Sequence, residues 1–474
     1  MRRGRVHDRG KGVRVRDGAL TLGVVAFIAI IALQRGAVDT RSAVAATTAP
    51  APAPVTLGST LFANGSEAGD PSPWTLAAEM RVAVEPTYEA VDASTALGFG
   101  QMVETWSACE ARFVGGDRLR DVIVVYHDAR TPGSPTNLPG AQLFRNTGTS
   151  YRIVFSWSRF SPQGNVPDRH HCIPGDWNAD GRMDVYFTAG RGGGNGVKEG
   201  RANELWIQRA PNVWVDRAAE WGVQDQCGRS HHGTRLDANL DGLPDLYVGN
   251  APPRDDPDDP CDAIPGSEES HLYLNVAGRK FVDATQTYGL TGHGGVNCAS
   301  APDYNKDGAR DLLVCRAAGL LVLRNKHGSG FVDKRAALGI PTTNFSDAKT
   351  SDVTNDGVRD LVTIVATAVQ VRSGISGTAR TIYSTTRGER IAIGDATSDG
   401  RRDVYVLRSN PLNRTNPQDV VLVSTGGGWS PVAVPNAGGI GDFALYLAGI
   451  PGYLVGNGSS ESIGKLQAIK VRPS

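Results

Sequence analysis

Short apolar runs recur along the chain, and each begins at the end of a cluster of acidic, polar and glycine residues. The runs are rich in β-branched and aromatic residues, which favours strands over helices. They are DVYFT (184–188), DLYVG (245–249), DLLVC (311–315), DLVTI (360–364) and DVYVL (403–407). The pattern therefore predicts an all-β chain in which each acidic cluster is a turn between two strands.

A second element follows the first three of these runs. It reads as a strand, a polar turn, another strand and a short segment that ends in Gly and an aliphatic residue. The segments are NELWIQRAPNVWVDRAAEWGV (203–223), HLYLNVAGRKFVDATQTYGL (271–290) and LLVLRNKHGSGFVDKRAALGI (320–340). One repeat therefore contains four strands, namely one before the acidic cluster, one after it, and this hairpin.

The acidic clusters share the spacing Asp-x-Asn/Thr-x-Asp-Gly-x-x-Asp. The five copies are DWNADGRMD from Asp176, DANLDGLPD from Asp237, DYNKDGARD from Asp303, DVTNDGVRD from Asp352 and DATSDGRRD from Asp395. Five copies with one spacing are repeats of a structural unit rather than coincidence. An EF-hand is excluded, because position 12 lacks a Glu and strands, not helices, are predicted to follow.

This spacing suits a hard cation such as Ca²⁺, which takes six to eight oxygen ligands. Positions 1, 3, 5 and 9 offer side-chain oxygens, Gly at position 6 allows the sharp turn, and position 7 can offer its carbonyl. About five structural Ca²⁺ ions are expected. The predicted ligands are Asp176, Asn178, Asp180, Arg182 and Asp184; Asp237, Asn239, Asp241, Leu243 and Asp245; Asp303, Asn305, Asp307, Ala309 and Asp311; Asp352, Thr354, Asp356, Val358 and Asp360; and Asp395, Thr397, Asp399, Arg401 and Asp403.

With these loops and hairpins, the units resemble FG-GAP/VCBS repeats, the blades of integrin-α-type β-propellers. The Phe-Val-Asp and Gly-Leu or Gly-Ile phrases resemble the cartilage-acidic-protein branch of that family. The resemblance covers roughly residues 75–474, and the C-terminal domain often appended in that branch is not evident. It implies Ca²⁺ binding in the loops and a role in adhesion, recognition or surface scaffolding.

Two degraded copies extend the array to seven units. One is FVGGDRLRD (113–121), and the other is VPNAGGIGD (434–442), which leads into FALYL. Both lack most ligands, so weak or no metal binding is expected there. Seven units of four strands predict one seven-bladed propeller. The strand-like VTLGSTLFA (55–63) is a candidate to complete the last blade and close the ring, since closure removes exposed sheet edges.

The first part of the chain reads as a targeting segment. A basic stretch precedes an uncharged apolar run from Ala19 to Leu33, which is the layout of a signal peptide or a signal anchor. The small residues Ala43-Val44-Ala45-Ala46 offer a cleavage site, and an uncleaved anchor stays open. The predicted organisation is a signal or anchor (1–46), a Pro/Ala-rich linker with the candidate closing strand (47–74) and the propeller (75–474).

The net charge supports this division. The 474 residues carry 49 basic and 49 acidic side chains, a formal charge of zero. Residues 1–46 hold nine basic and three acidic side chains, so the remainder holds 40 basic and 46 acidic ones. The zero sum is therefore a basic export segment added to an acidic propeller. Such a balance argues against a nucleic-acid partner, and a membrane contact is expected only through the N-terminal anchor.

Six cysteines lie in the exported part, where an oxidising compartment favours disulfides. Six cysteines allow 15 pairings. Cys298 and Cys315 flank one loop at nearly opposite positions, Cys227 and Cys261 bracket another, and Cys109 and Cys172 remain. These three pairs are the predicted disulfides.

Three further patterns are ambiguous. His170-His171 and His231-His232 occupy matching places before two loops, either as zinc ligands or as equivalent residues that face each other or a central channel. RDDPDDPCD (254–262) is a cation-binding or simply solvated loop. RGGGNG (191–196) lacks the context of a nucleotide site.

The sequence predicts an exported, non-enzymatic calcium-binding propeller that recognises an unidentified protein or glycan. The alternative is a propeller-fold polysaccharide lyase or hydrolase, with His171, His232 and Arg235 as candidate residues. No local nucleophile motif selects it.

Overall fold

The chain divides into two units, Met1–Met80 and Arg81–Ser474, and all described residues lie in the second. The computed structural model describes residues 86–100, 105–126, 139–158, 168–190, 202–252, 261, 264, 266, 269–343, 345–365, 367–385, 388–408, 417–435, 443–456 and 466–474. The targeting segment, the linker, VTLGSTLFA and RGGGNG fall outside these residues, as does RDDPDDPCD apart from Cys261.

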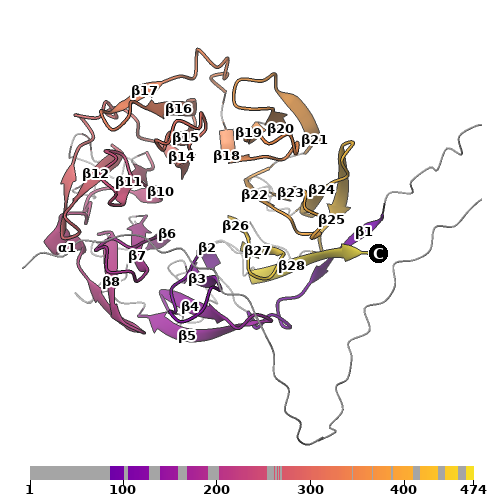
Figure 1. Ribbon diagram of the computed structural model, residues 1–474, viewed down its shortest axis with the longest axis horizontal. Coiled ribbons are helices and arrows are strands. Elements are labelled where there is room, and N and C mark those ends of the chain that lie inside the picture. Colours follow the sequence, from indigo (N-terminus) through magenta and orange to yellow (C-terminus); the bar gives the residue numbers. More distant parts are fainter. Residues whose placement is uncertain are drawn as a thin grey trace, which may run out of the picture. The chain divides into compact units, whose positions relative to one another are not determined.

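The second unit is a ring of seven four-stranded antiparallel sheets (Figure 1). Blades 1 to 3 comprise β2 (Thr105–Ala111), β3 (Asp121–Tyr126), β4 (Ala141–Asn146) and β5 (Tyr151–Trp157); β6 (Arg169–Gly175), β7 (Asp184–Ala189), β8 (Glu204–Ala210) and β9 (Val213–Asp216); and β10 (Ser230–Leu236), β11 (Asp245–Asn250), β12 (His271–Val276) and β13 (Lys280–Asp283).

Blades 4 to 6 comprise β14 (Val296–Ser300), β15 (Leu312–Arg316), β16 (Gly319–Asn325) and β17 (Phe331–Asp333); β18 (Phe345–Ser351), β19 (Asp360–Val365), β20 (Ala368–Arg372) and β21 (Arg380–Ser384); and β22 (Arg390–Gly394), β23 (Asp403–Leu407), β24 (Val420–Ser424) and β25 (Trp429–Ala433). Blade 7 comprises β26 (Phe443–Tyr446), β27 (Tyr453–Gly456), β28 (Leu466–Pro473) and β1 (Tyr88–Asp92). The predicted seven-bladed propeller is confirmed.

The only helix in the described part of the chain is the single turn α1 (Ala218–Trp221). It belongs to the first of the segments that end in Gly and an aliphatic residue. Gly222 there has a left-handed φ of 77°, and the amide of Val223 bonds back to the carbonyl of Ala218 at 2.9 Å. This arrangement caps the turn and buries Val223 completely. The recurring phrase is therefore a turn with a buried hydrophobic anchor.

Seven clusters of buried hydrophobic side chains fill the junctions between neighbouring blades. The junction of blades 1 and 2, for example, buries Ile123, Trp157 and Phe187. Every residue of β3, β7 and β11 is buried, because another blade covers each face of these second strands. This two-sided burial explains why the second strands read as continuous apolar runs rather than alternating ones.

The ring closes with a strand from the N-terminal side, but that strand differs from the predicted one. β1 takes the outermost place in blade 7 and pairs antiparallel with β28, with Tyr88 opposite Pro473. β1 therefore holds the closing position for which 55–63 was the candidate, and 55–63 itself lies outside the described residues. β1 reads YEAVD and is mostly half-buried, so its hydrophobic pattern is too short and too polar to stand out.

The repeat spacing also predicted the wrong residues for the loop of blade 7. In the other blades the acidic loop joins the first strand to the second, whereas 434–442 lies before the first strand, β26. The equivalent loop is LAGIPG (447–452) between β26 and β27, which contains no acidic residue. The prediction that 434–442 is the seventh loop is therefore wrong.

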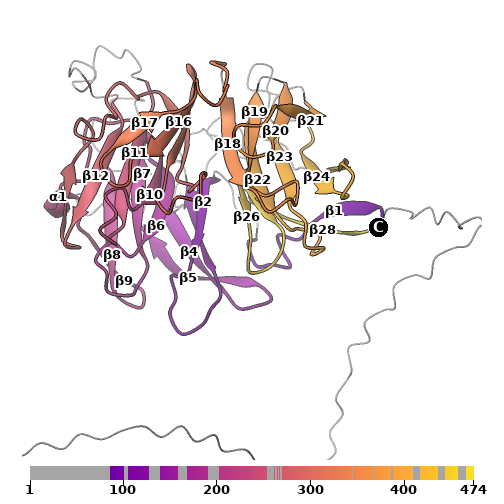
Figure 2. The ribbon, with the colours of Figure 1, turned by 45° about the horizontal axis from the view of Figure 1, so that its top comes forward.

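All acidic loops lie on the same side of the ring. The first strands of neighbouring blades surround the centre of the ring and contact one another in turn (Figure 1). Because each blade repeats the same up-and-down order, the connection from first to second strand returns to the same face every time (Figure 2). We call this side the loop face.

Candidate functional site: the acidic loops

The five loops share one backbone geometry. In each, the carboxylate at position 1 accepts hydrogen bonds from the backbone amides at positions 5 and 6. Asp176 accepts from Asp180 at 2.9 Å and from Gly181 at 2.8 Å, and the other four loops repeat both bonds. Position 4 is a non-glycine residue with φ between 55° and 61°, and Gly at position 6 has φ between 81° and 87°. The turn therefore requires a left-handed backbone conformation at position 6, which glycine adopts without steric cost.

The carboxylate at position 5 is held by the amide of position 7. The distances are 2.8 to 3.0 Å in all five loops. In the loop of blade 4, burial opposes ionisation, but the amide of Ala309 and the side chain of Asn305 outweigh it and lower the pKa of Asp307. The position-5 carboxylates are thus anions set near the surface by the loop's own amides.

Position 9 has a structural role that the sequence did not predict. Its carboxylate is completely buried in all five loops. One oxygen of Asp184 accepts the amide of Trp177 at 3.0 Å, and the other accepts the amide of Gln208, on the third strand, at 2.8 Å. The same two bonds recur at Asp245, Asp311, Asp403 and, in the degraded loop of blade 1, Asp121. At Asp360 the second bond comes from the amide of Gly374, just after the third strand, at 3.2 Å. This side chain ties the loop to the sheet.

Burial raises the pKa of several of these position-9 carboxyls. Burial is the main cause that raises the pKa of Asp184 to about 7, and the charges of Asp180 and Asp176 raise it further. The hydrogen bonds from the two backbone amides lower this pKa but do not offset the rise. The pKa values of Asp245 and Asp311 are raised to about 6 for the same reasons. Carboxylates crowded in this way gain from a nearby cation.

Position 3 divides the loops into two types. In blades 2, 3 and 4 an Asn side chain donates to the carboxylate at position 5, at 2.8 to 2.9 Å. In blades 5 and 6 Thr354 and Thr397 instead donate their hydroxyls to the carboxylate at position 9, at 3.0 and 3.3 Å. Both side chains keep an oxygen that can serve as a ligand.

Position 7 decides whether a loop contains its own cation. Arg182 and Arg401 each pair with the position-5 carboxylate of their loop, the latter at 2.7 Å from Asp399. Their Nε atoms also donate to the third-strand carbonyls of Gln208 and Ser424 at 2.9 Å. Within the described residues, the aspartates at positions 1 and 5 of the loops at 237–245 and 352–360 have no ion-pair partner.

The donor set fits a hard cation by its chemistry. Each loop offers three carboxylates, one amide or hydroxyl oxygen and backbone carbonyls, and a carboxylate oxygen that accepts one N–H keeps a second lone pair. The three carboxylates of a loop do not all come within 4.8 Å of one another in the described structure. Among the described residues, one group of possible metal ligands does lie within this distance, namely Cys298, Cys315 and Asp347. Cys298 and Cys315 form a disulfide, so this group is no metal site.

The degraded loop of blade 1 is closed by an ion pair. Asp117 stands at position 5, and Arg145 on β4 approaches it to 3.1 Å. The hydrogen bond from Arg145 and the amide of Leu119 lower the pKa of Asp117. A guanidinium therefore neutralises the single carboxylate left at positions 1, 3 and 5.

The three predicted disulfides are confirmed. Cys109–Cys172 joins the first strands of blades 1 and 2, with the Cα atoms 5.9 Å apart. Cys227–Cys261 has a Cα separation of 5.2 Å, and Cys298–Cys315 links residues directly opposite each other on β14 and β15 at 4.8 Å. Three disulfides indicate an oxidising environment. Among the described residues, no helix is long and apolar enough to cross a bilayer.

The paired histidines face each other across blades 2 and 3. The rings of His170 and His231 have centroids 4.2 Å apart, and those of His171 and His232 are 5.7 Å apart. Burial and the charges of Lys349 and Arg390 lower the pKa of His171 to about 4. Ser107 lies 3.1 Å from Nδ1 of His171. The prediction that these are repeat-equivalent residues on first strands is confirmed.

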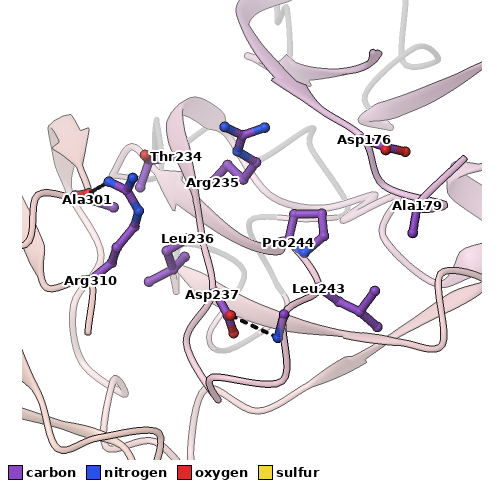
Figure 3. A pocket seen from close by; sticks show the side chains of 11 residues that line it. Asp176, Ala179, Thr234, Arg235, Leu236, Asp237, Leu243, Pro244, Ala301 and Arg310 are labelled. Carbon is purple, nitrogen blue, oxygen red and sulfur yellow. Dashed lines mark hydrogen bonds between the residues drawn. The ribbon is translucent and has the colours of Figure 1, made fainter. Parts of the chain in front are cut away.

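A pocket of about 470 Å³ opens on the loop face between blades 2, 3 and 4. It is lined by Arg235 of β10, by Arg310 of the next blade, and by the position-1 carboxylates Asp176 and Asp237 (Figure 3). The sequence pointed to Arg235 only as a candidate of the enzymatic alternative. It did not point to Arg310, because nothing local relates position 8 of one loop to the strand of another blade.

Neither known protein families nor curated proteins give a match. Three solved structures resemble the chain in fold. A lectin of Agrocybe aegerita that recognises non-reducing terminal N-acetylglucosamine has 15% identity and a TM-score of 0.40, and covers 73% of this chain and 80% of its own. The extracellular domain of the hybrid two-component system BT4673 of B. thetaiotaomicron has 10% identity and a TM-score of 0.46, covering 81% and 40%.

The third is BBS1N in complex with ARL6DN, with 11% identity and a TM-score of 0.46, covering 82% of this chain and 98% of that one. None of the three bears on the function of this chain.

Proposed function

We propose that the chain is an exported, calcium-binding β-propeller that recognises a protein or glycan ligand. The observation that carries the proposal is the backbone geometry that five acidic loops on one face of the ring share. Each loop presents carboxylates at positions 1 and 5 near the surface and buries a third at position 9. Unrelated solvated turns would not repeat the same backbone angles and the same hydrogen bonds.

The residues at positions 1, 3, 5 and 7 would hold the ion, and position 9 would contribute its charge. When bound, the ion offsets the repulsion among three carboxylates within nine residues. Since the unfolded chain has no such loops, Ca²⁺ would bind the folded state and stabilise it by mass action. About five ions are expected per chain.

Two measurements test calcium binding. Equilibrium dialysis should give about five Ca²⁺ per chain, and excess chelator should lower the melting temperature. Magnesium should substitute poorly, because it demands near-ideal octahedral geometry and dehydrates reluctantly. An unchanged melting curve in chelator, or uptake of no Ca²⁺, would refute the calcium proposal.

Export is supported by the three disulfides, and ligand recognition is the role that suits a rigid ring without a nucleophile motif. Incubation with a panel of polysaccharides tests this role. Binding without product supports recognition. Release of unsaturated or reducing ends would instead support the lyase or hydrolase alternative.

A further inference from the structure

Arginines gather around the centre of the loop face. Position 8 of the loop is Arg in four blades, and in two of them the guanidinium turns back toward the end of the first strand of its own blade. Arg310 donates to the carbonyl of Ala301 at 2.9 Å, and Arg359 approaches the carbonyl of Thr350 at 3.5 Å. The four arginines at position 8 are exposed, as is Arg235 on β10. We call these five residues the arginine collar: Arg120, Arg235, Arg310, Arg359 and Arg402.

The pocket between blades 2, 3 and 4 contains two members of this collar. In the described part of the chain, the guanidinium of Arg235 has no hydrogen-bond or ion-pair partner, and that of Arg310 has one bond, to Ala301 (Figure 3). Both therefore keep N–H donors for a ligand.

The same pocket also offers acceptors. Asp176 and Asp237 bring carboxylate oxygens from two neighbouring loops, and Thr234 adds a hydroxyl. Guanidinium groups match a carboxylate in two-pronged geometry, whereas carboxylates and hydroxyls match hydroxyl donors. A ligand that carries both an anionic oxygen pair and several hydroxyls would satisfy the whole lining.

We propose that this pocket binds an acidic saccharide, with the carboxylate of a uronate residue on Arg235 and Arg310 and the sugar hydroxyls toward Asp176, Asp237 and Thr234. The inference deepens the proposed recognition function by naming the ligand class. A volume of about 470 Å³ lies within the usual range for small-ligand pockets.

The residues that line the pocket favour an acidic saccharide over a nucleic acid. Proteins that bind single strands stack the bases on aromatic side chains. The residues that line the pocket include no aromatic ring. A nucleic-acid partner would also be expected to leave a strongly basic composition, whereas the exported part of the chain is acidic.

The test is calorimetric titration of the full propeller with digalacturonate, its neutral counterpart digalactose, sodium sulfate and a single-stranded oligonucleotide. The variants are Arg235→Gln and Arg310→Gln. Arg152→Gln, an exposed arginine on the outermost strand β5, is the matched control. Each titration is run in Ca²⁺ and in chelator, and calcium uptake is measured separately.

We expect digalacturonate alone to bind, and each pocket variant to weaken it about tenfold or more. The Arg152→Gln control should bind as the wild type does, and all variants should keep their calcium uptake and melting temperature. Absence of digalacturonate binding, equal binding of digalactose, sulfate or the oligonucleotide, or unchanged binding by both pocket variants would overturn the proposal. Loss of calcium uptake in the wild type would refute the calcium proposal alone.

Discussion

The side-chain amide of Asn275 donates a hydrogen bond of 2.8 Å to the backbone carbonyl of Trp177, which is the second residue of the acidic loop in the preceding blade. The same amide group donates to Pro244 of its own loop at 3.1 Å. Asn325 repeats both contacts one blade further, to Ala238 at 3.0 Å and to Arg310 at 3.2 Å. A single side chain therefore links two neighbouring loops.

Removing this link should destabilise the ring. Asn325→Ala loses both donated bonds and the bond that its oxygen accepts from Gly328 at 2.8 Å. It leaves a buried carbonyl of Ala238 without a partner, and we expect a loss of about 2–3 kcal/mol. Denaturant unfolding measures it. The control Gln286→Ala removes an exposed amide and should stay within about 0.5 kcal/mol; equal losses in both variants would contradict the link.

Positions 5 and 9 of one loop should separate metal binding from folding. Asp245→Asn places an amide N–H against one of two backbone N–H groups in a buried site. We expect a loss of about 1–3 kcal/mol with or without chelator. Asp241→Asn should instead reduce calcium uptake by one ion and leave stability in chelator nearly unchanged. Equilibrium dialysis and thermal unfolding of both variants distinguish these outcomes, and identical behaviour of the two would refute the division of roles.

The arginine at position 7 should compete with calcium. Arg401 holds Asp399 at 2.7 Å, so Arg401→Ala should raise the calcium affinity of this loop severalfold by freeing an anion. Arg402→Ala removes the same charge one residue away, where no ion pair to Asp399 exists among the described residues, and is the matched control. In a background where the other four acidic loops carry an Asp→Asn substitution at position 5, calcium titration reports the affinity of this loop alone. A higher affinity in both variants would indicate only a change in net charge.

The pair of His271 and Asp283 should make stability depend on pH. Their side chains lie 2.8 Å apart. Burial opposes protonation of His271, but Asp283 and Asp225 outweigh it and raise its pKa. Burial likewise opposes ionisation of Asp283, yet the bonds from His271 and Thr285 lower its pKa to about 2.

The sign of each shift sets the pH window. The histidine contribution is complete below the ordinary pKa of His and is lost as the pH rises through the raised value. The aspartate contribution is present above the ordinary pKa of Asp and is lost as the pH falls toward about 2. The melting-temperature difference between wild type and His271→Gln should therefore be largest near pH 5 and shrink by pH 8.5. In an Asp283→Asn background the pH dependence of this difference should largely vanish.

Local repetition made most of the propeller predictable from the sequence. The position-9 Asp is followed at once by a strand buried on both faces, so loop and strand are visible in one window of residues. The disulfides followed from the places of the cysteines relative to these loops. The bonds from Asn275 and Asn325 were not predictable, because they join residues of different blades and only the folded ring brings them together.

The failures share a physical reason. Blade 7 lacks the acidic signature, so its short loop at 447–452 could not be aligned with the other loops. Asp442 resembles the Asp at position 9, and the loop was therefore predicted at 434–442 instead. The closing strand β1 gains its stability from pairing with β28 rather than from its own composition. A segment whose structure depends on a distant partner leaves little trace in its local hydrophobic pattern.

The pairing of β1 with β28 also constrains the order of events during biogenesis. Arg472 on β28 contacts Glu89 on β1 at 2.7 Å across 383 residues of sequence. The first strand of the propeller to be synthesised must therefore wait for the last one before it acquires its partner. Such distant contacts slow folding, because the intervening chain must be ordered first. Until then both strand edges stay open to pairing with other chains.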